Sequence, residues 1–383
     1  MQTTAQGWLV LGLTNSAGML GLTSAAANLP TLLLSLYAGA LADRVDQRRL
    51  LVLTQILAAV FTAILALLVT TGGVQFWHVL VIAFLVGCTS ALASPAYQSL
   101  VSTLVPPAAL GNAIALNSAQ FNFSRIVGPT FAGIGIAVAG LALSFWANSL
   151  SFVVVALVLA TLPIRNTRAI GRLEASLWTN IADGIRYARS APVVPTLLLL
   201  TVAPALFNLN YLVLMPVFAR DVLDIGAPGL GLLTSAVGIG ALTGALIIAV
   251  ARPGGGSGML VITALIASST GLLVFSLSTW LPLSLIGLAV AGGCAVAYYT
   301  TTNTLLQLLV PMRVRGRVMS LYILGSTGLV PLGNVIVGPI ADHIGAPAAL
   351  AGCALSTILI CCVVGLRSRG LRELHASRVA TPA

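Results

Sequence analysis

The chain has 383 residues, of which 58% are apolar and 7% are charged, whereas soluble domains carry about 25% charged residues. This composition predicts a membrane protein with room for roughly twelve helices of about 20 residues each. All 18 basic residues are arginine, so a P-loop lysine, and with it ATP-driven transport by this chain alone, is excluded.

In chain order, breaks at charged residues and at Pro and Gly separate twelve apolar segments. They lie near residues 1–13, 17–42, 50–71, 76–104, 112–138, 141–163, 193–219, 229–251, 257–277, 280–309, 314–341 and 346–366. Eleven are long enough to cross a bilayer, but the first reaches only about 20 Å of a core near 30 Å thick. We therefore expect a truncated first helix, a natural start upstream of Met1, and poor insertion or weak transport by the chain as it stands.

Arginine is distributed unevenly between the two sides of these segments. One set of alternate connections, together with the C-terminal tail, holds 16 of the 18 arginines. The opposite connections hold only Arg220, and Arg125 lies inside a segment. Because cytoplasmic loops carry the excess of basic residues, the pattern predicts a multi-pass protein of the cell membrane with a cytoplasmic C-terminus.

The connection at 164–192 is long and separates two halves. The predicted parts are an N-terminal helix bundle at 1–163, a cytoplasmic interdomain loop at 164–192, a C-terminal bundle at 193–366 and a cytoplasmic tail at 367–383. Within the loop, Leu177, Ile181 and Ile185 recur at helical spacing after Ser176 and predict an amphipathic helix on the inner leaflet. A solvated linker is the alternative.

Glycine and proline positions recur between the halves. Six pairs are separated by 205 residues: Gly87/Gly292, Pro106/Pro311, Gly111/Gly316, Gly128/Gly333, Gly133/Gly338 and Gly140/Gly345. The run Leu22 to Ala25 also recurs as Leu233 to Ala236, at an offset of 211. Such copies indicate parallel repeats. We therefore expect an all-α membrane fold of two six-helix bundles related by a parallel repeat.

The connection after the second segment reads GALADRVDQRR. It resembles the signature loop of the major facilitator superfamily, in which a glycine, a helix-end aspartate and a basic cluster follow one another. The matching residues are Gly39, Asp43, Arg44, Arg48 and Arg49. The resemblance implies a major facilitator fold and a conformational latch in which Asp43 meets Arg313, Arg315 or Arg317. A basic turn that only follows the positive-inside rule is the alternative.

A second resemblance lies in the fifth segment, where four residues partly match the motif of drug and metabolite exporters in this superfamily: Ser124, Gly128, Pro129 and Gly133. Glycine permits close helix approach and proline kinks a helix, so a purely structural kink is the alternative. Further stretches resemble the transmembrane secretion effector branch, which includes the enterobactin exporter. They lie at 111–122, 125–129, 210–223 and 315–322.

Arg125 is the one charge well inside an apolar segment, where it costs about 2.5–3.5 kcal/mol at mid-membrane. Asn122 precedes it by three residues and shares its helix face. A substrate or coupling role, a structural arginine bonded to helix carbonyls, and snorkelling to the interface are the three alternatives.

The resemblance also implies that the first, fourth, seventh and tenth helices line a central cavity. Their polar candidates for substrate contact or coupling are Gln6, Tyr97, Gln98, Asn208, Asn210, Tyr211, Tyr298, Tyr299 and Asn303. The set offers hydrogen bonds and aromatic faces without negative charge, which favours a large neutral or anionic amphiphile. Polar residues that join helices to each other are the alternative.

The function implied by the resemblance is secondary active export of drugs, siderophores or similar amphipathic metabolites by alternating access. We expect proton coupling, no cofactor, no metal and no nucleic-acid partner. A remaining difficulty is that no carboxylate lies inside a span, so the coupling group lies upstream, is Asp342, or is not needed. A truncated non-transporting remnant or assembly subunit is the alternative. An intramembrane enzyme is disfavoured, because the sequence has no HExxH, paired carboxylates or Ser/His arrangement.

Overall fold

The computed structural model describes residues 2–103, 105–106, 109–161, 186–187, 191–251 and 257–374, which are helical along most of their length and form no strand. The first half contains α1 (Gln2–Thr14), α2 (Ala17–Arg44), α3 (Gln47–Thr70), α4 (Phe76–Thr103) and α5 (Leu110–Thr161). The second half contains α7 (Val194–Ala203), η2 (Pro204–Asn208), α8 (Tyr211–Val217), η3 (Phe218–Val222), α9 (Gly226–Ala251), α10 (Gly258–Leu277), α11 (Leu281–Leu309), α12 (Met312–Ile323), η4 (Leu324–Gly328), α13 (Val330–Ile344), α14 (Ala346–Arg367) and α15 (Arg369–Arg372), where η marks a π-helix.

The long helix α5 is two membrane helices joined at Gly140. This glycine has φ +79° and ψ 173°, a backbone conformation that is essentially limited to glycine. The π-helical segment η2 joins α7 to α8, η3 continues α8, and η4 joins α12 to α13. Ten helices of the described chain are long and apolar enough to cross a membrane, with α5 counted once and α1 not among them. The predicted all-α membrane fold is confirmed.

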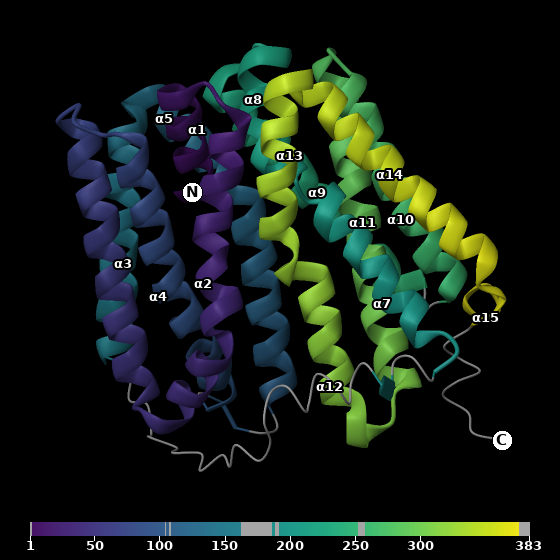
Figure 1. Ribbon diagram of the computed structural model, residues 1–383. Helices are drawn as coiled ribbons and strands as arrows, with labels where there is room; N and C mark the ends of the chain where they lie inside the picture. The colour runs from purple at the N-terminus through teal and green to yellow at the C-terminus, as the bar shows by residue number, and fades with distance from the viewer. Residues whose placement is uncertain are drawn as a thin grey trace. The chain divides into compact units, whose positions relative to one another are not determined.

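The chain divides into two compact units. Unit 1 consists of Met1–Glu174 and Ile225–Gly231, and unit 2 consists of Ala175–Asp224 and Leu232–Ala383. In unit 1, α4 packs against α2 and α3, and α3 packs against α5 (Figure 1). In unit 2, α10 packs between α11 and α14 (Figure 1). The amphipathic helix predicted within 164–192 lies outside the described residues apart from Arg186 and Tyr187, so it stays a prediction.

The repeat seen in the sequence has a structural counterpart in each unit. A Cβ atom placed on Gly87 would overlap the carbonyl oxygen of Ala27 on α2, and one placed on Gly292 would overlap that of Val237 on α9. Both glycines therefore allow two helices to pack backbone against backbone. Gly345, between α13 and α14, has a φ of +86°, and Gly140, between the two parts of α5, has a φ of +79°. Paired glycines thus perform the same task in both units.

The end of the described chain folds back onto unit 2. The amide of Gly258, at the start of α10, donates a hydrogen bond to the carbonyl of Leu374 over 2.9 Å. Leu371 on α15 is fully buried in a cluster that includes Val193 and Val261. Helix α15 therefore covers the same end of unit 2 at which α7 and α10 begin.

Candidate functional site

The seventh membrane helix, which consists of α7, η2, α8 and η3, changes its hydrogen-bond pattern in the middle. Leu209 N–H bonds to Pro204 C=O over 3.0 Å, which is the i to i+5 bond of a π-helix. The Asn210 side chain then donates to the carbonyls of Leu206 and Phe207 over 2.5 and 3.0 Å. Such π segments are rare and are frequently found at functional sites. The break leaves Asn208 and Tyr211 on either side of a two-residue turn between η2 and α8.

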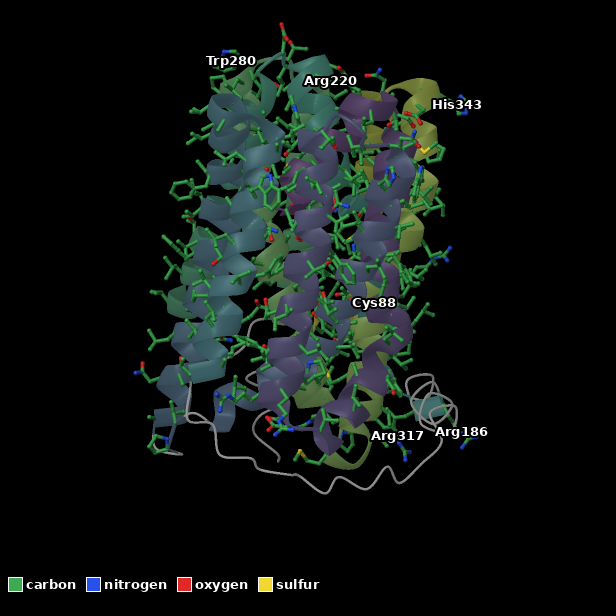
Figure 2. All side chains as sticks on the ribbon, turned by 90° about the vertical axis from the view of Figure 1, so that its left-hand side faces the viewer. Cys88, Arg186, Arg220, Trp280, Arg317 and His343 are labelled. Carbon is green, nitrogen blue, oxygen red and sulfur yellow. The ribbon has the colours of Figure 1, made fainter. Side chains whose placement is uncertain are left out.

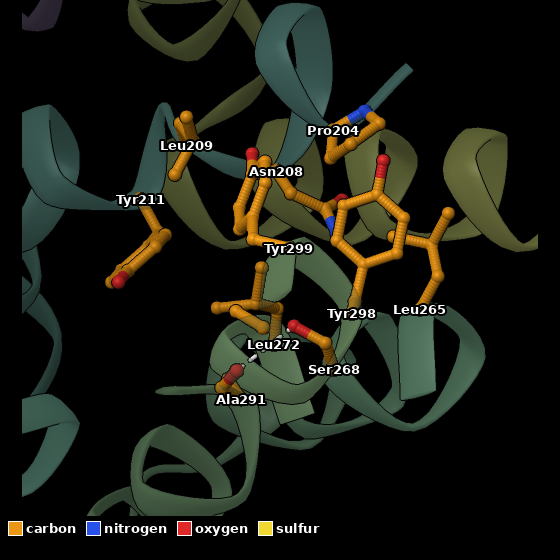
Figure 3. Close-up of a pocket in the computed structure, with 11 residues that line it drawn as sticks. Pro204, Asn208, Leu209, Tyr211, Leu265, Ser268, Leu272, Ala291, Tyr298 and Tyr299 are labelled. Carbon is orange, nitrogen blue, oxygen red and sulfur yellow. Dashed lines mark hydrogen bonds between the residues drawn. The ribbon is translucent and has the colours of Figure 1, made fainter. Parts of the chain in front are cut away.

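A cavity of about 30 Å³ lies beside this break, entirely within unit 2. It is lined from the seventh helix by Pro204, Asn208 and Tyr211, from α10 by Ser268, and from α11 by Tyr298 and Tyr299, with apolar side chains completing the wall. The rings of Tyr298 and Tyr299 are 4.8 Å apart, edge to face, and line the cavity together with Asn208 (Figure 3). This volume has room for about two water molecules.

Most polar groups of the cavity wall bond to neighbouring helices. Asn208 Nδ2 donates to Ser269 Oγ over 2.8 Å. Ser268 Oγ donates to Ala291 C=O over 2.9 Å (Figure 3). Tyr298 OH donates to Leu200 C=O over 3.0 Å. By contrast, Asn208 Oδ1 and Tyr299 OH are buried and have no hydrogen-bond partner among the described residues. These two atoms therefore have unused hydrogen-bonding capacity for a ligand.

The six residues predicted in the second half therefore divide into two groups. Four of them meet at the cavity: Asn208, Tyr211, Tyr298 and Tyr299. Asn210 is 1% exposed and caps its own helix segment, so its geometry matches the structural alternative. Asn303 Oδ1 accepts a bond from Gln307 Nε2 over 2.6 Å on the same helix.

The candidates of the first half join helices where their side chains are described. Gln6 Nε2 bonds to Val79 C=O on α4 over 3.4 Å, and Tyr97 OH bonds to Asn117 Oδ1 on α5 over 2.6 Å. Tyr97 is also 43% exposed. Gln98 lies on α4 and Asn122 and Arg125 lie on α5, but their side chains lie outside the described part of the structure.

The exporter motif on α5 forms a close helix contact within unit 1. A Cβ on Gly133 would lie 2.6 Å from Ala227 C=O, and one on Gly231 would lie 3.1 Å from Pro129 C=O. Ser124 is exposed and accepts a bond from Gln120 Nε2 over 3.0 Å. Pro129 lies inside α5 close to Gly128. The motif therefore brings α5 against the first turns of α9.

The predicted latch residues lie at helix ends. Gly39, Asp43 and Arg44 lie in the last turns of α2, and their side chains lie outside the described part of the structure. Arg48 Nε donates to Leu159 C=O over 3.0 Å. Arg49, with a side chain 88% exposed, lies 3.6 Å from Asp46.

The other two latch residues belong to α12. Arg315 Nε donates to Val310 C=O over 3.2 Å, and Arg317 lies two residues further along the helix. In unit 2, Arg186 and Arg317 lie at one end, and Arg220, Trp280 and His343 lie at the other (Figure 2).

Sequence reasoning missed several residues at these places. Ser268 and Ser269 on α10 were not candidates, although two adjacent serines in an apolar segment are a detectable signal. Asp46 caps α3 by accepting bonds from the Arg48 and Arg49 amides, and aspartate directly before a helix is a recognisable cap. Asn117, the partner of Tyr97, had no such signal. Within the described part of the chain, no three His, Cys, Asp or Glu side chains gather to hold a metal ion.

Two units of apolar helices with repeated glycine contacts define a multi-pass membrane protein with the major facilitator fold. Among solved structures, a bacterial homolog of the human lysosomal transporter Spinster has a TM-score of 0.72 at 16% identity and matches 100% of this chain and 96% of its own. The nucleoside transporter NupG has a TM-score of 0.72 at 12% identity, with 95% and 93% coverage. At these identities, the likeness concerns the fold.

Sequence comparison then gives the family. The pattern of the transmembrane secretion effector family matches residues 1–381, and the chain belongs to this family. It is 31% identical over 378 residues to the multidrug efflux pump Tap of Mycolicibacterium fortuitum, covering 96% of this chain and 91% of that protein. It is 26% identical over 370 residues to the staphyloferrin A transporter of Staphylococcus aureus, with 95% and 91% coverage. The chain is therefore a transporter of small molecules, and not an enzyme.

Proposed function

We propose that this protein is a secondary active exporter of amphipathic small molecules, which works by alternating access of its two units and is driven by protons. The observation that carries the proposal is the 31% identity to a multidrug efflux pump over 96% of the chain. The similarity to a staphyloferrin A transporter favours a substrate range that includes polar metabolites as well as drugs. Such transporters rock around a site near the middle of the membrane.

The substrate site of this proposal includes the cavity of unit 2. Tyr211, Tyr298 and Tyr299 offer aromatic side chains, and Asn208 offers an amide, so one polar group of an amphiphile can form a hydrogen bond there. No carboxylate lines the cavity, which favours a neutral molecule over a permanent cation. Gln6, Tyr97, Gln98, Asn122 and Asn303 are proposed as further contacts for substrate or the coupling ion.

Arg125 is proposed to contact substrate or a coupling group. Arg125→Lys keeps the charge but loses the planar fork, and Arg125→Gln loses the charge but keeps hydrogen bonding. Reduced efflux by both variants at equal membrane abundance supports the role. Full efflux by Arg125→Gln would contradict it.

The cytoplasmic side is assigned from the arginine pattern. The end of unit 2 that carries Arg186 and Arg317 is proposed to face the cytoplasm, as is the C-terminal tail (Figure 2). At this side, Asp43 and the arginines at 44, 48, 49, 315 and 317 are proposed to act as a conformational latch.

The function is tested by expression in a bacterial host that lacks its own efflux pumps. We expect increased resistance to several unrelated drugs, and uptake of those drugs into inverted vesicles that stops when the pH gradient is collapsed. Gly352→Ala serves as the matched control, because a Cβ there meets no other atom within 4 Å. A protein that reaches the membrane but changes neither resistance nor siderophore export would favour the alternative of a non-transporting assembly subunit.

A further inference from the structure

The amide of Asn208 has a defined orientation. Ser269 Oγ donates its single proton to Leu265 C=O over 2.9 Å, so this hydroxyl can only accept from Asn208. The group of Asn208 that lies 2.8 Å from Ser269 Oγ is therefore the NH₂ group, and Oδ1 is the other. Asn208 is 4% exposed, and its Oδ1 has no partner among the described residues. A buried carbonyl without a donor is unfavourable.

The hydroxyl groups around Asn208 are also oriented by their neighbours. The Ser268 proton goes to Ala291 C=O and the Tyr298 proton goes to Leu200 C=O. Both oxygens therefore keep lone pairs and have no proton left for a ligand. Tyr299 OH, which has no partner in the described chain, can still donate. The polar part of the cavity is thus rich in neutral acceptors and poor in donors.

We propose that this cavity, which Asn208, Tyr298 and Tyr299 line (Figure 3), is a binding site for one small hydrogen-bond donor, which bonds to Asn208 Oδ1. The volume of about 30 Å³ limits the donor to a water molecule or to a single amino or hydroxyl group of a larger ligand. Water and a ligand amino group share this chemistry. Binding of a ligand amino group rests on the proposed export function, whereas binding of water does not.

The site is tested by hydroxyl-radical labelling of the full-length protein in nanodiscs, in which radiolysis of bound water oxidises adjacent side chains. We expect strong labelling of Tyr298 and Tyr299 although both are largely shielded from solvent. Phe218 and Phe275, which are fully buried against each other at 4.5 Å, are the dry reference. Labelling of the tyrosines no higher than that of the two phenylalanines, after correction for intrinsic reactivity, would overturn the proposal.

Two variants separate the acceptor from general packing. Asn208→Leu keeps the volume but removes Oδ1, so we expect labelling of Tyr298 and Tyr299 to fall about tenfold, the effect of one lost hydrogen bond. Ser269→Ala removes the partner of Nδ2 and leaves Oδ1 in place, so it should change labelling less than about twofold. If Asn208→Leu does not fold, Tyr299→Phe replaces it, with reduced labelling expected at Tyr298. Wild-type labelling in the Oδ1-deficient variant contradicts the site.

A pair of probes then identifies the source of the donor. Methylammonium carries N–H donors, whereas tetramethylammonium has the same charge and none. Reduced tyrosine labelling with methylammonium alone assigns the site to a ligand amino group, and unchanged labelling with both assigns it to resident water. An equal reduction by both compounds would contradict the requirement for a donor. Efflux is measured separately, so loss of export with intact labelling concerns only the proposed function.

Discussion

Units 1 and 2 use their matched glycines in the same way but differ around them. Gly87 and Gly292 each bring a helix against a carbonyl of its neighbour, and Gly140 and Gly345 each carry a positive φ between consecutive helices. The helix caps match as well, because Asp46 caps α3 and Ser257 caps α10 at the offset of 211 that also relates Leu22 and Leu233. Positions that set helix packing thus recur in both copies.

The units differ where chemistry is concentrated. The described residues of unit 1 contain no π-helix, whereas unit 2 contains η2, η3 and η4. The residues equivalent to η4 at the offset of 205, 119–123, continue as regular helix within α5. The π segment η2 also borders the cavity with its unpartnered Asn208 Oδ1. Among the described residues, unit 2 therefore combines π-helical backbone with a polar cavity, on glycine contacts that it shares with unit 1.

The largest effect is expected from Gly87→Val and Gly292→Val. Each side chain would overlap a backbone carbonyl that cannot rotate away, so the two helices must separate, at a cost of about 3 kcal/mol or more. The loss is measured as a lower apparent Tm of the purified protein in detergent. Gly352→Val, at an open position, is the control and should be near neutral. If the protein tolerates one of the two valine substitutions but not the other, the helix contacts at Gly87 and Gly292 are not equivalent.

The next effect concerns Gly140→Ala and Gly345→Ala. At φ values of +79° and +86°, alanine is strained whatever space surrounds it, so each substitution should cost roughly 1–3 kcal/mol. The two losses of apparent Tm should be similar in size. Gly316→Ala, on α12 with open space around it, controls for the added methyl group. If Gly140→Ala is harmless, α5 does not need this break, and the match with Gly345 has no structural meaning.

The matched caps should contribute about 1 kcal/mol each. Asp46→Ala and Ser257→Ala remove the side-chain acceptor of the first helical amides of α3 and α10. Asp46→Asn retains an acceptor and should keep the wild-type Tm. Arg49→Ala should cost less than about 0.5 kcal/mol, since the ion pair is exposed.

Asp43→Asn should leave Tm unchanged and reduce efflux. A lower Tm with unchanged efflux would show that Asp43 is not part of the latch.

The smallest difference is expected between two tyrosines. Tyr298→Phe removes a buried bond to Leu200 C=O in unit 2 and should cost about 1 kcal/mol. Tyr97→Phe removes a bond to Asn117 in unit 1, but Tyr97 is 43% exposed, so the cost should stay below about 0.5 kcal/mol. Thermal unfolding of both variants in one detergent gives the comparison. A larger decrease in Tm for Tyr97→Phe than for Tyr298→Phe would show that the bond between Tyr97 and Asn117 is shielded from water in the working protein.

The fold could be predicted because it depends on segment length, apolar content and the spacing of glycines such as Gly87 and Gly292. These features act through local geometry and can be read directly from the amino-acid sequence. The cavity could be predicted only in part. Tyr298 and Asn208 were candidates through their residue types, but their meeting with Ser268 depends on the π turn at Pro204, which is set by packing against other helices. For the same reason Asn210, adjacent to Asn208, was a candidate for substrate contact although its amide bonds to its own helix.

The contact between Gly258 and Leu374 has a consequence for biosynthesis. Gly258 is synthesised more than one hundred residues before Leu371, so the amide of Gly258 and the apolar cluster that receives Leu371 stay uncovered during that interval. At a synthesis rate of about 5–20 residues per second, this interval lasts several seconds. Unit 2 can therefore complete its packing only after nearly the whole chain has been translated, and the last turn of helix closes it.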